Sequence, residues 1–189
     1  MVHIRSDCYA RPREGGVTAK GGKPSKSRRG PRRPVEEAPP RKHVLLLSCM
    51  DQRLVDETLA FMNGLNLHNR YDHLIIAGAA MGCRHCTSGG TPWSAIFFDH
   101  LVAAIEPLER KIQDIFILEH LDCGAYGLDF CPHHEAYRAL STAEEFDGQR
   151  PYHQTEARAF ADEIDVCAKR ASTVPEYADA WRKVKSGVL

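Results

Sequence analysis

Residues 43–49 read His-Val-Leu-Leu-Leu-Ser-Cys, and this stretch decides the fold class. It is an uninterrupted apolar run of strand length, which is typical of a parallel strand buried on both faces. Two more runs, Leu-Ile-Ile-Ala at 74–77 and Ile-Phe-Ile-Leu at 115–118, have the same character. The alternation of such runs with helical segments predicts an α/β fold with a central, mainly parallel β-sheet flanked by helices. The helical segments, in which apolar residues recur at the i, i+3, i+4 spacing, are 55–62, 93–104, 157–168 and 177–184.

The charges of the chain are divided unevenly along its length. The 189 residues carry 25 basic and 25 acidic side chains, yet residues 1–42 hold 12 of the Lys and Arg residues and only 4 of the Asp and Glu residues. The same segment holds 6 of the 11 prolines. A segment this charged and proline-rich buries too little apolar surface to offset its chain entropy. We therefore expect a disordered basic tail at 1–42 and one folded domain at 43–189.

The composition also bears on partners and location. A basic tail suits an acidic protein partner, and the lack of aromatic residues between 10 and 42 argues against base stacking on nucleic acid. No apolar run is long enough to cross a membrane, and the start of the chain lacks the apolar segment of a secretory signal. The expected location is therefore cytoplasmic, with no membrane partner.

Residues that bind metals stand where two of the predicted strands end. Cys49 closes the first run, and His120 and Cys123 follow the third. In open α/β sheets the carboxyl ends of the strands gather ligands, so residues distant in sequence can meet there. Two thiolates and one imidazole form a zinc set that leaves a fourth tetrahedral position for water. The alternative is that all three are buried side chains without a metal.

The residues around these ligands match two short motifs. Residues 49–53 (Cys-Met-Asp-Gln-Arg) have the form Cys-x-Asp-x-Arg, and residues 120–123 (His-Leu-Asp-Cys) have the form His-x-x-Cys. In this order and on these elements, the motifs resemble those of the β-class carbonic anhydrases, over about residues 43–128. On this resemblance, the segment 43–189 is a β-carbonic anhydrase-like zinc domain.

The resemblance implies a site and a reaction. Cys49, His120 and Cys123 would bind one zinc ion (Zn2+) per chain, and Asp51 and Arg53 would form the catalytic dyad beside it. Zinc-bound hydroxide would attack carbon dioxide and give bicarbonate, in a reversible hydration. In some family members the same aspartate occupies the fourth zinc position and closes the site. A homodimer or a dimer of dimers is expected on the same ground, with the site at the subunit interface.

The chain departs from the family pattern at two places. Ile75 and Ile76 stand where the family usually has Arg and Asn, and Glu119 stands where it usually has glycine. A carboxylate beside the ligand histidine raises the pKa of a zinc-bound water unless it is paired or directed away. The substrate therefore stays open: the same site in relatives hydrolyses carbonyl sulfide or carbon disulfide. A further alternative is a non-catalytic zinc-binding module that serves assembly.

A second group of cysteines and histidines is separate from these motifs. The chain has seven cysteines, an odd number, which does not suggest a disulfide framework. Cys83 and Cys86 form a Cys-x-x-Cys pair within residues 81–92, whose Gly, Thr and Pro content predicts a loop. With Cys131 and the two histidines that follow it, the pair has three interpretations: a second metal site, a reversible disulfide, or loop residues at the mouth of the active site.

Overall fold

The computed structural model of the chain describes residues 2–5, 43–140 and 146–186. The elements in chain order are β1 (Val2–Arg5), β2 (His43–Ser48), the 3-10 helix η1 (Gln52–Leu54), α1 (Val55–Gly64), β3 (Tyr71–Ile75), α2 (Ala79–His85), β4 (Thr87–Ser88), β5 (Thr91–Pro92), α3 (Trp93–Ile105), β6 (Ile112–His120), the 3-10 helix η2 (Gly124–Gly127), α4 (His134–Ala139), α5 (Phe146–Ala171), α6 (Ala178–Trp181) and β7 (Lys185–Ser186).

The fold is α/β, with a small parallel sheet flanked by helices. The strand order is β1-β6-β2-β3, and every pairing in this sheet is parallel. The strands β6 and β2, predicted from two of the apolar runs, are central. The third run, 74–77, only overlaps β3, which spans 71–75, lies at the edge of the sheet and is partly exposed. The two-residue β7 pairs with Asp114 and Ile115 of β6. Because the central strands run in one direction, their carboxyl ends lie at the same end of the sheet.

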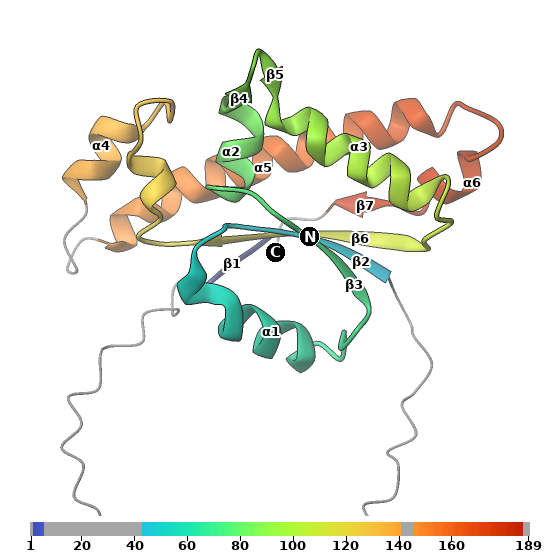
Figure 1. Cartoon of the computed structure of the whole chain (residues 1–189), viewed down its shortest axis with the longest axis horizontal. Helices are drawn as coiled ribbons and strands as arrows, with labels where there is room; N and C mark the ends of the chain where they lie inside the picture. The colour runs from blue at the N-terminus through green and yellow to red at the C-terminus, as the bar shows by residue number, and fades with distance from the viewer. Residues whose placement is uncertain (1, 6–42, 141–145, 187–189) are drawn as a thin grey trace, which may run out of the picture.

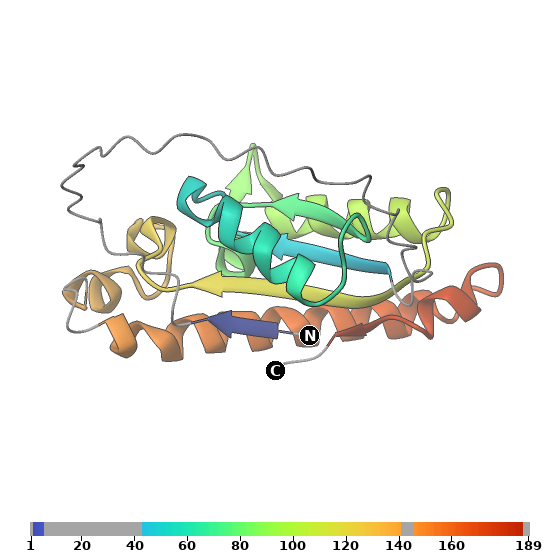
Figure 2. The same cartoon turned by 90° about the horizontal axis from the view of Figure 1, so that it is seen from below.

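Helices cover both faces of the sheet. Figure 1 shows α1 on one face and α2, α3 and α5 on the other, and Figure 2 shows α1 crossing in front of β2. The apolar residues of β2 serve both layers in alternation, because successive side chains of a strand point to opposite faces. Leu45 and Leu47 pack with Phe97 and Phe160 of the larger helical layer. Val44 and Leu46 pack with side chains of α1, Phe61 and Met62.

The prediction of a loop at 81–92 is wrong for its first half. Residues 79–85 form α2, and the polar remainder contains the β4–β5 hairpin. One of the three glycines in this segment, Gly82, is needed in the helix for close packing: a Cβ built there would lie 1.9 Å from the backbone oxygen of Ala77. A glycine in the sequence favours a loop, whereas here the close packing of a helix requires it.

The predicted tail needs a correction at its start. Residues 2–5 form β1, which pairs in parallel with residues 117–120 of β6. Val2 and Ile4 are β-branched residues at alternate positions, a short pattern that suits an added edge strand. Residue 1 and residues 6–42, which carry the prediction of disorder and of an acidic partner, lie outside the described residues.

The packing of Gly82 gives a test of the fold. Gly82→Ala should destabilise the protein by about 2 kcal/mol or more, because the new methyl group meets a backbone carbonyl that cannot move alone. Gly64→Ala, at the end of α1, is the matched control, since a Cβ there has no neighbour within 4 Å. Urea unfolding of both variants would measure the difference, and equal stabilities would contradict the packing described for α2.

Candidate metal centre

Three side chains from two neighbouring strands meet at the carboxyl end of the sheet. Cys49 follows β2, His120 ends β6, and Cys123 comes three residues later. One ligand atom from each lies within 4.8 Å of the other two, and the two Sγ atoms are 3.7 Å apart. The residues are 8%, 4% and 1% exposed, respectively. This buried group could bind a metal ion.

The imidazole of His120 is held in the orientation that a metal ligand needs. Its Nδ1 lies 2.9 Å from the carbonyl oxygen of Leu121, which places the ring proton on Nδ1. Its Nε2 is buried and has no hydrogen-bond partner among the described residues. An orphaned buried nitrogen is unfavourable by itself, so its lone pair fits a bound cation.

The thiol of Cys49 lies in surroundings that favour the thiolate. The hydrogen bond from the Cys123 thiol, the Gly78 amide 3.3 Å from Sγ, and the nearby His120 lower the pKa of Cys49 to about 4. Gly78 can approach because its φ of 72° is left-handed and it lacks a Cβ, which would meet the Met81 side chain at 2.6 Å. The loop after β3 therefore contributes a donor to the first ligand.

Asp51 and Arg53 form the pair that the motif predicts. The Arg53 side chain donates to both carboxylate oxygens of Asp51, with Nη2 2.6 Å from Oδ2, and the Arg53 amide lies 2.9 Å from Oδ1. These bonds lower the pKa of Asp51 to about 2. Oδ2 lies 4.0 Å from Nε2 of His120, so the carboxylate stands beside the ligand group without closing on the histidine.

Arg53 also reaches a residue that the sequence did not single out. Its Nη1 donates to Oδ2 of Asp122 and its Nη2 to the Asp122 carbonyl, both at 3.0 Å. Asp122 has a φ of 56°, in the left-handed region where aspartate is better tolerated than most residues. The guanidinium thus joins the Cys49 loop to the Cys123 loop. Nothing in the spacing of the motifs marked Asp122.

The carboxylate of Glu119 does not face the ligand group. Along β6, residues 115 and 117 face the layer of α2, α3 and α5, and Glu119 continues that side of the strand. Its side chain is buried there and accepts hydrogen bonds from Ala80, Tyr126 and His153. The sequence marked Glu119 as a possible disturbance of the site. The structure shows its carboxylate hydrogen-bonded on the face opposite to His120, although its charge still contributes to the raised pKa of His120 and of Cys123.

A small cavity opens beside Cys49 and Asp51. Its volume is about 200 Å³. Its wall is mostly apolar, with one imidazole, that of His73, whose Nε2 lies 2.7 Å from Oγ of Ser48. The other residues around it are Met50, Leu54, Val55, Thr58, Leu59, Tyr71 and Ile75.

The second cysteine group does not form a metal site. Among residues 43–140 and 146–184, the group of Cys49, His120 and Cys123 is the only one close enough to share an ion. Cys83 is part of the core and Cys86 is buried; both thiols are free, and burial raises the pKa of Cys86 to about 11. His85 and His133, which could have been ligands, instead lie 2.9 Å from the carboxylate of Glu156.

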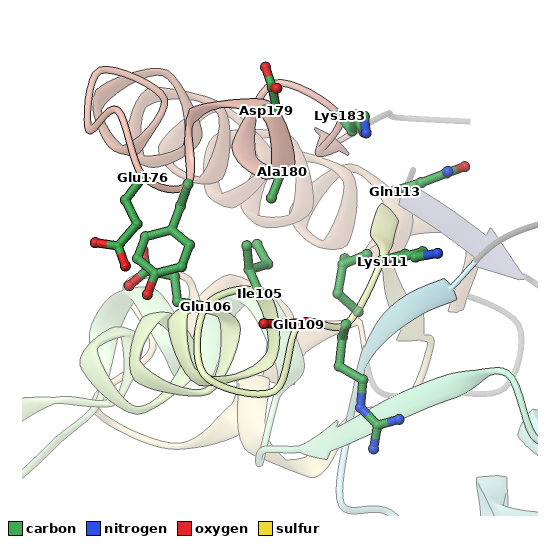
Figure 3. A pocket seen from close by; sticks show the side chains of 12 residues that line it. Ile105, Glu106, Glu109, Lys111, Gln113, Glu176, Asp179, Ala180 and Lys183 are labelled. Atoms are coloured by element: carbon green, nitrogen blue, oxygen red, sulfur yellow. The ribbon is translucent and has the colours of Figure 1, made fainter.

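A larger cavity of about 440 Å³ lies at the other end of the sheet (Figure 3). It surrounds Lys111 and Ile112, at the start of β6, and residues of the α6 region. Its charged residues have both signs, and one carboxylate, that of Glu106, accepts a hydrogen bond from the Trp181 indole at 3.0 Å. Neither histidine nor cysteine lines it, so its chemistry is separate from that of the metal-ligand group.

Comparisons with known proteins give relatives but no family. The chain is 36% identical over 85 residues to an uncharacterized protein of Rickettsia bellii (strain RML369-C) and, over the same length, to one of Rickettsia conorii (strain Malish 7). The match covers 44% of this chain and 48% and 42% of those two proteins, less than half of each. No family model and no solved structure matches. In the described part of the chain, no helix has the length and apolar character needed to cross a membrane.

Metal uptake should depend on pH. The hydrogen bond to Cys49 and burial raise the pKa of the Cys123 thiol, and the Cys49 sulfur raises that of His120 despite its burial. The Cys123 thiol therefore holds a proton that a metal must displace, and below its raised pKa the His120 imidazole holds a second one on Nε2, so zinc affinity should rise by roughly tenfold or more between about pH 6 and about pH 8. Competition with a chromophoric chelator would measure it. Cys167→Ser, outside the group, should show the same dependence, and a pH-independent affinity would contradict this assignment.

Proposed function

We propose that this chain catalyses the zinc-dependent, reversible hydration of carbon dioxide to bicarbonate, as a relative of the β-class carbonic anhydrases. The observation that carries the proposal is the buried group of Cys49, His120 and Cys123 with the Asp51 carboxylate 4.0 Å from the histidine. The same five residues that form the two sequence motifs are neighbours in space. Two short motifs that matched by chance would have no reason to lie close together in the fold.

The ligand set favours zinc over other ions. Two thiolates and one neutral imidazole suit Zn2+ and leave a position for water. Zinc in such a site supplies Lewis acidity, which ionises a water near neutral pH. The residues fit this role: one thiol is already a thiolate at neutral pH, and the free lone pair of His120 is directed into the group.

The Asp51–Arg53 pair supplies orientation. Because the pKa of Asp51 lies near 2, its carboxylate accepts hydrogen bonds at neutral pH and cannot donate one. If a water were bound beside the group, Oδ2 of Asp51 would accept a hydrogen bond from it, and a lone pair of that water would then be directed away from Asp51. The forked contact with Arg53 fixes the carboxylate, and the bonds from Arg53 to Asp122 fix the arginine.

The cavity supports a small neutral substrate. Its volume of about 200 Å³ and its apolar wall suit a compact molecule without charge. Carbon dioxide, carbonyl sulfide and carbon disulfide all meet this description, and Ile75, at the rim of the cavity, occupies one of the positions where the chain departs from the family pattern. The two sulfur compounds are therefore the alternative substrates.

A substitution in the Asp51–Arg53 pair tests the proposed enzyme activity. Asp51→Asn should bind zinc as the parent does but hydrate carbon dioxide about 100-fold more slowly or worse, since the amide can donate where the carboxylate only accepts. Stopped-flow assays of zinc-loaded full-length protein would measure the rate. Asp56→Asn, an exposed carboxylate five residues away, should keep parent activity.

The outcomes separate the candidate functions. An Asp51→Asn variant as active as the parent would remove the dyad from the mechanism. Faster turnover of carbonyl sulfide or carbon disulfide in parallel assays would favour the hydrolase alternative. A protein that contains zinc and turns over none of the three compounds would favour the non-catalytic assembly module.

A second copy of the chain is the partner we propose for the surface around the cavity. Met50, Val55, Leu59 and Ile75 are exposed apolar side chains there, and β3 pairs on only one side within the described sheet. Leu59→Glu should convert a dimer to a monomer, as measured by light scattering. Val166→Glu, an exposed apolar residue of α5, should leave the mass unchanged. A monomeric parent would contradict the dimer.

A further inference from the structure

A network of buried polar side chains lies behind the metal-ligand group, on the side of the sheet that α5 covers. The side chains of Glu119 and His153 are both 0% exposed, and Tyr126 and Tyr137 are buried with them. None of the four belongs to the candidate ligand set. Burying a carboxylate away from solvent is unfavourable unless it is well hydrogen-bonded. The buried position of Glu119, directly before His120, therefore needs a physical reason.

The carboxylate of Glu119 has a donor at both oxygens. The Ala80 amide lies 2.9 Å from Oε1. The Tyr126 hydroxyl lies 3.2 Å from Oε2, and Nδ1 of His153 lies 3.1 Å from the same oxygen. These donors come from α2, η2 and α5, three elements that meet only in the folded protein. The carboxylate therefore links these elements to the end of β6.

The network continues from His153 to the third ligand. Nε2 of His153 lies 3.0 Å from the Tyr137 hydroxyl, whose oxygen lies 2.9 Å from the amide nitrogen of Cys123. An amide only donates, so the tyrosine oxygen accepts from Cys123. Burial raises the pKa of Tyr137, which keeps its proton available for Nε2. His153 then carries its proton on Nδ1 and donates it to Glu119, so that every hydrogen bond runs in one direction.

The loop that carries Cys123 needs such support. Asp122 adopts a left-handed φ of 56°, a conformation that aspartate tolerates better than most residues but that is still less favourable than the ordinary right-handed and extended regions. Its amide donates to Oε1 of the buried Gln149 at 2.7 Å, and Arg53 holds its carbonyl from the other side. The next amide along the chain, that of Cys123, donates a hydrogen bond to the Tyr137 hydroxyl oxygen.

We propose that Glu119, His153 and Tyr137 are positioning residues of the metal centre, which hold the Cys123 backbone so that its sulfur faces Cys49 before a metal arrives. The inference deepens the proposed function and rests on its metal-binding part. A loop that is held in advance loses less conformational entropy on binding, so the affinity for the ion is higher. Outer partners of this kind typically change metal affinity by about 10–100-fold when they are removed.

The first experiment compares a tyrosine of the network, Tyr137, with a partly buried neighbour, Tyr152. Tyr137→Phe removes the hydroxyl that joins Cys123 to His153, while Tyr152→Phe removes a neighbouring hydroxyl outside it, on a ring 6.3 Å from that of Tyr137. Zinc affinity of the full chain, measured by chelator competition, should fall about 10–100-fold for Tyr137→Phe and stay within about twofold for Tyr152→Phe. The thiolate-to-metal absorption of the cobalt(II) form should shift for Tyr137→Phe only.

A second variant and a direct measurement complete the test. Glu119→Gln places an amide donor against the donors from His153, Tyr126 or Ala80, and it should also weaken zinc binding. In the parent, the ring nitrogen chemical shifts of His153 should show the Nδ1–H tautomer. A proton on Nε2 alone, or variants that melt earlier while both bind zinc as tightly as the parent, would overturn the proposal.

The test separates this inference from the proposed enzyme activity. A zinc-loaded parent that hydrates no carbon dioxide would overturn the activity, while the affinity loss in Tyr137→Phe would still support the positioning role. Parent affinity in both network variants, with an active parent, would overturn the positioning role alone. A parent that takes up neither zinc nor cobalt would overturn both.

Discussion

The parallel pairing of β2 with β6 is the constraint on which the rest of the structure depends. Leu47 lies opposite Ile117 and Ser48 opposite Leu118, so the residues that follow these positions leave the sheet side by side. This register brings Cys49 and His120 together. Contacts between sequence neighbours cannot do so, because the two residues lie at the ends of different strands. A shift of register by one residue would direct each strand's side chains to the other face and separate the ligands.

The electrostatics of the site follow from that geometry. A thiolate at Cys49 is stabilised by a thiol, an amide and an imidazole, and the carboxylate of Asp51 is stabilised by one guanidinium. The anion at Glu119 lies on the opposite face of β6, with its own donors, because neighbouring residues of a strand point in opposite directions. Two negative groups adjacent to the ligands are thus each satisfied separately. The candidate metal-ligand group lies between the Asp51–Arg53 pair on one side and the hydrogen-bond network of Glu119 on the other.

Much of this arrangement could be predicted from the sequence. The apolar runs at 43–49 and 115–118 indicated the two central strands, and their ends indicated the candidate ligands. The run at 74–77 overlaps the edge strand β3. These signals are local: a strand buried on both faces needs a continuous apolar run, and a residue that follows it lies at the sheet edge. Other features could not be predicted in this way. The helix α2 was hidden by Gly82, whose role depends on the backbone of Ala77, and β1 depends on the free edge of β6.

The sequence by itself determined the fold class, the strand ends that carry Cys49, His120 and Cys123, and the order of the two motifs. The tertiary structure alone decided which side chains complete them: Asp122 beside Arg53, and His153 and Tyr137 between Glu119 and the Cys123 amide. The physical reason is the range of the interactions. Burial patterns repeat every two or four residues and can be read along the chain, whereas a hydrogen-bond partner on another element is fixed only when the sheet and its helices have packed.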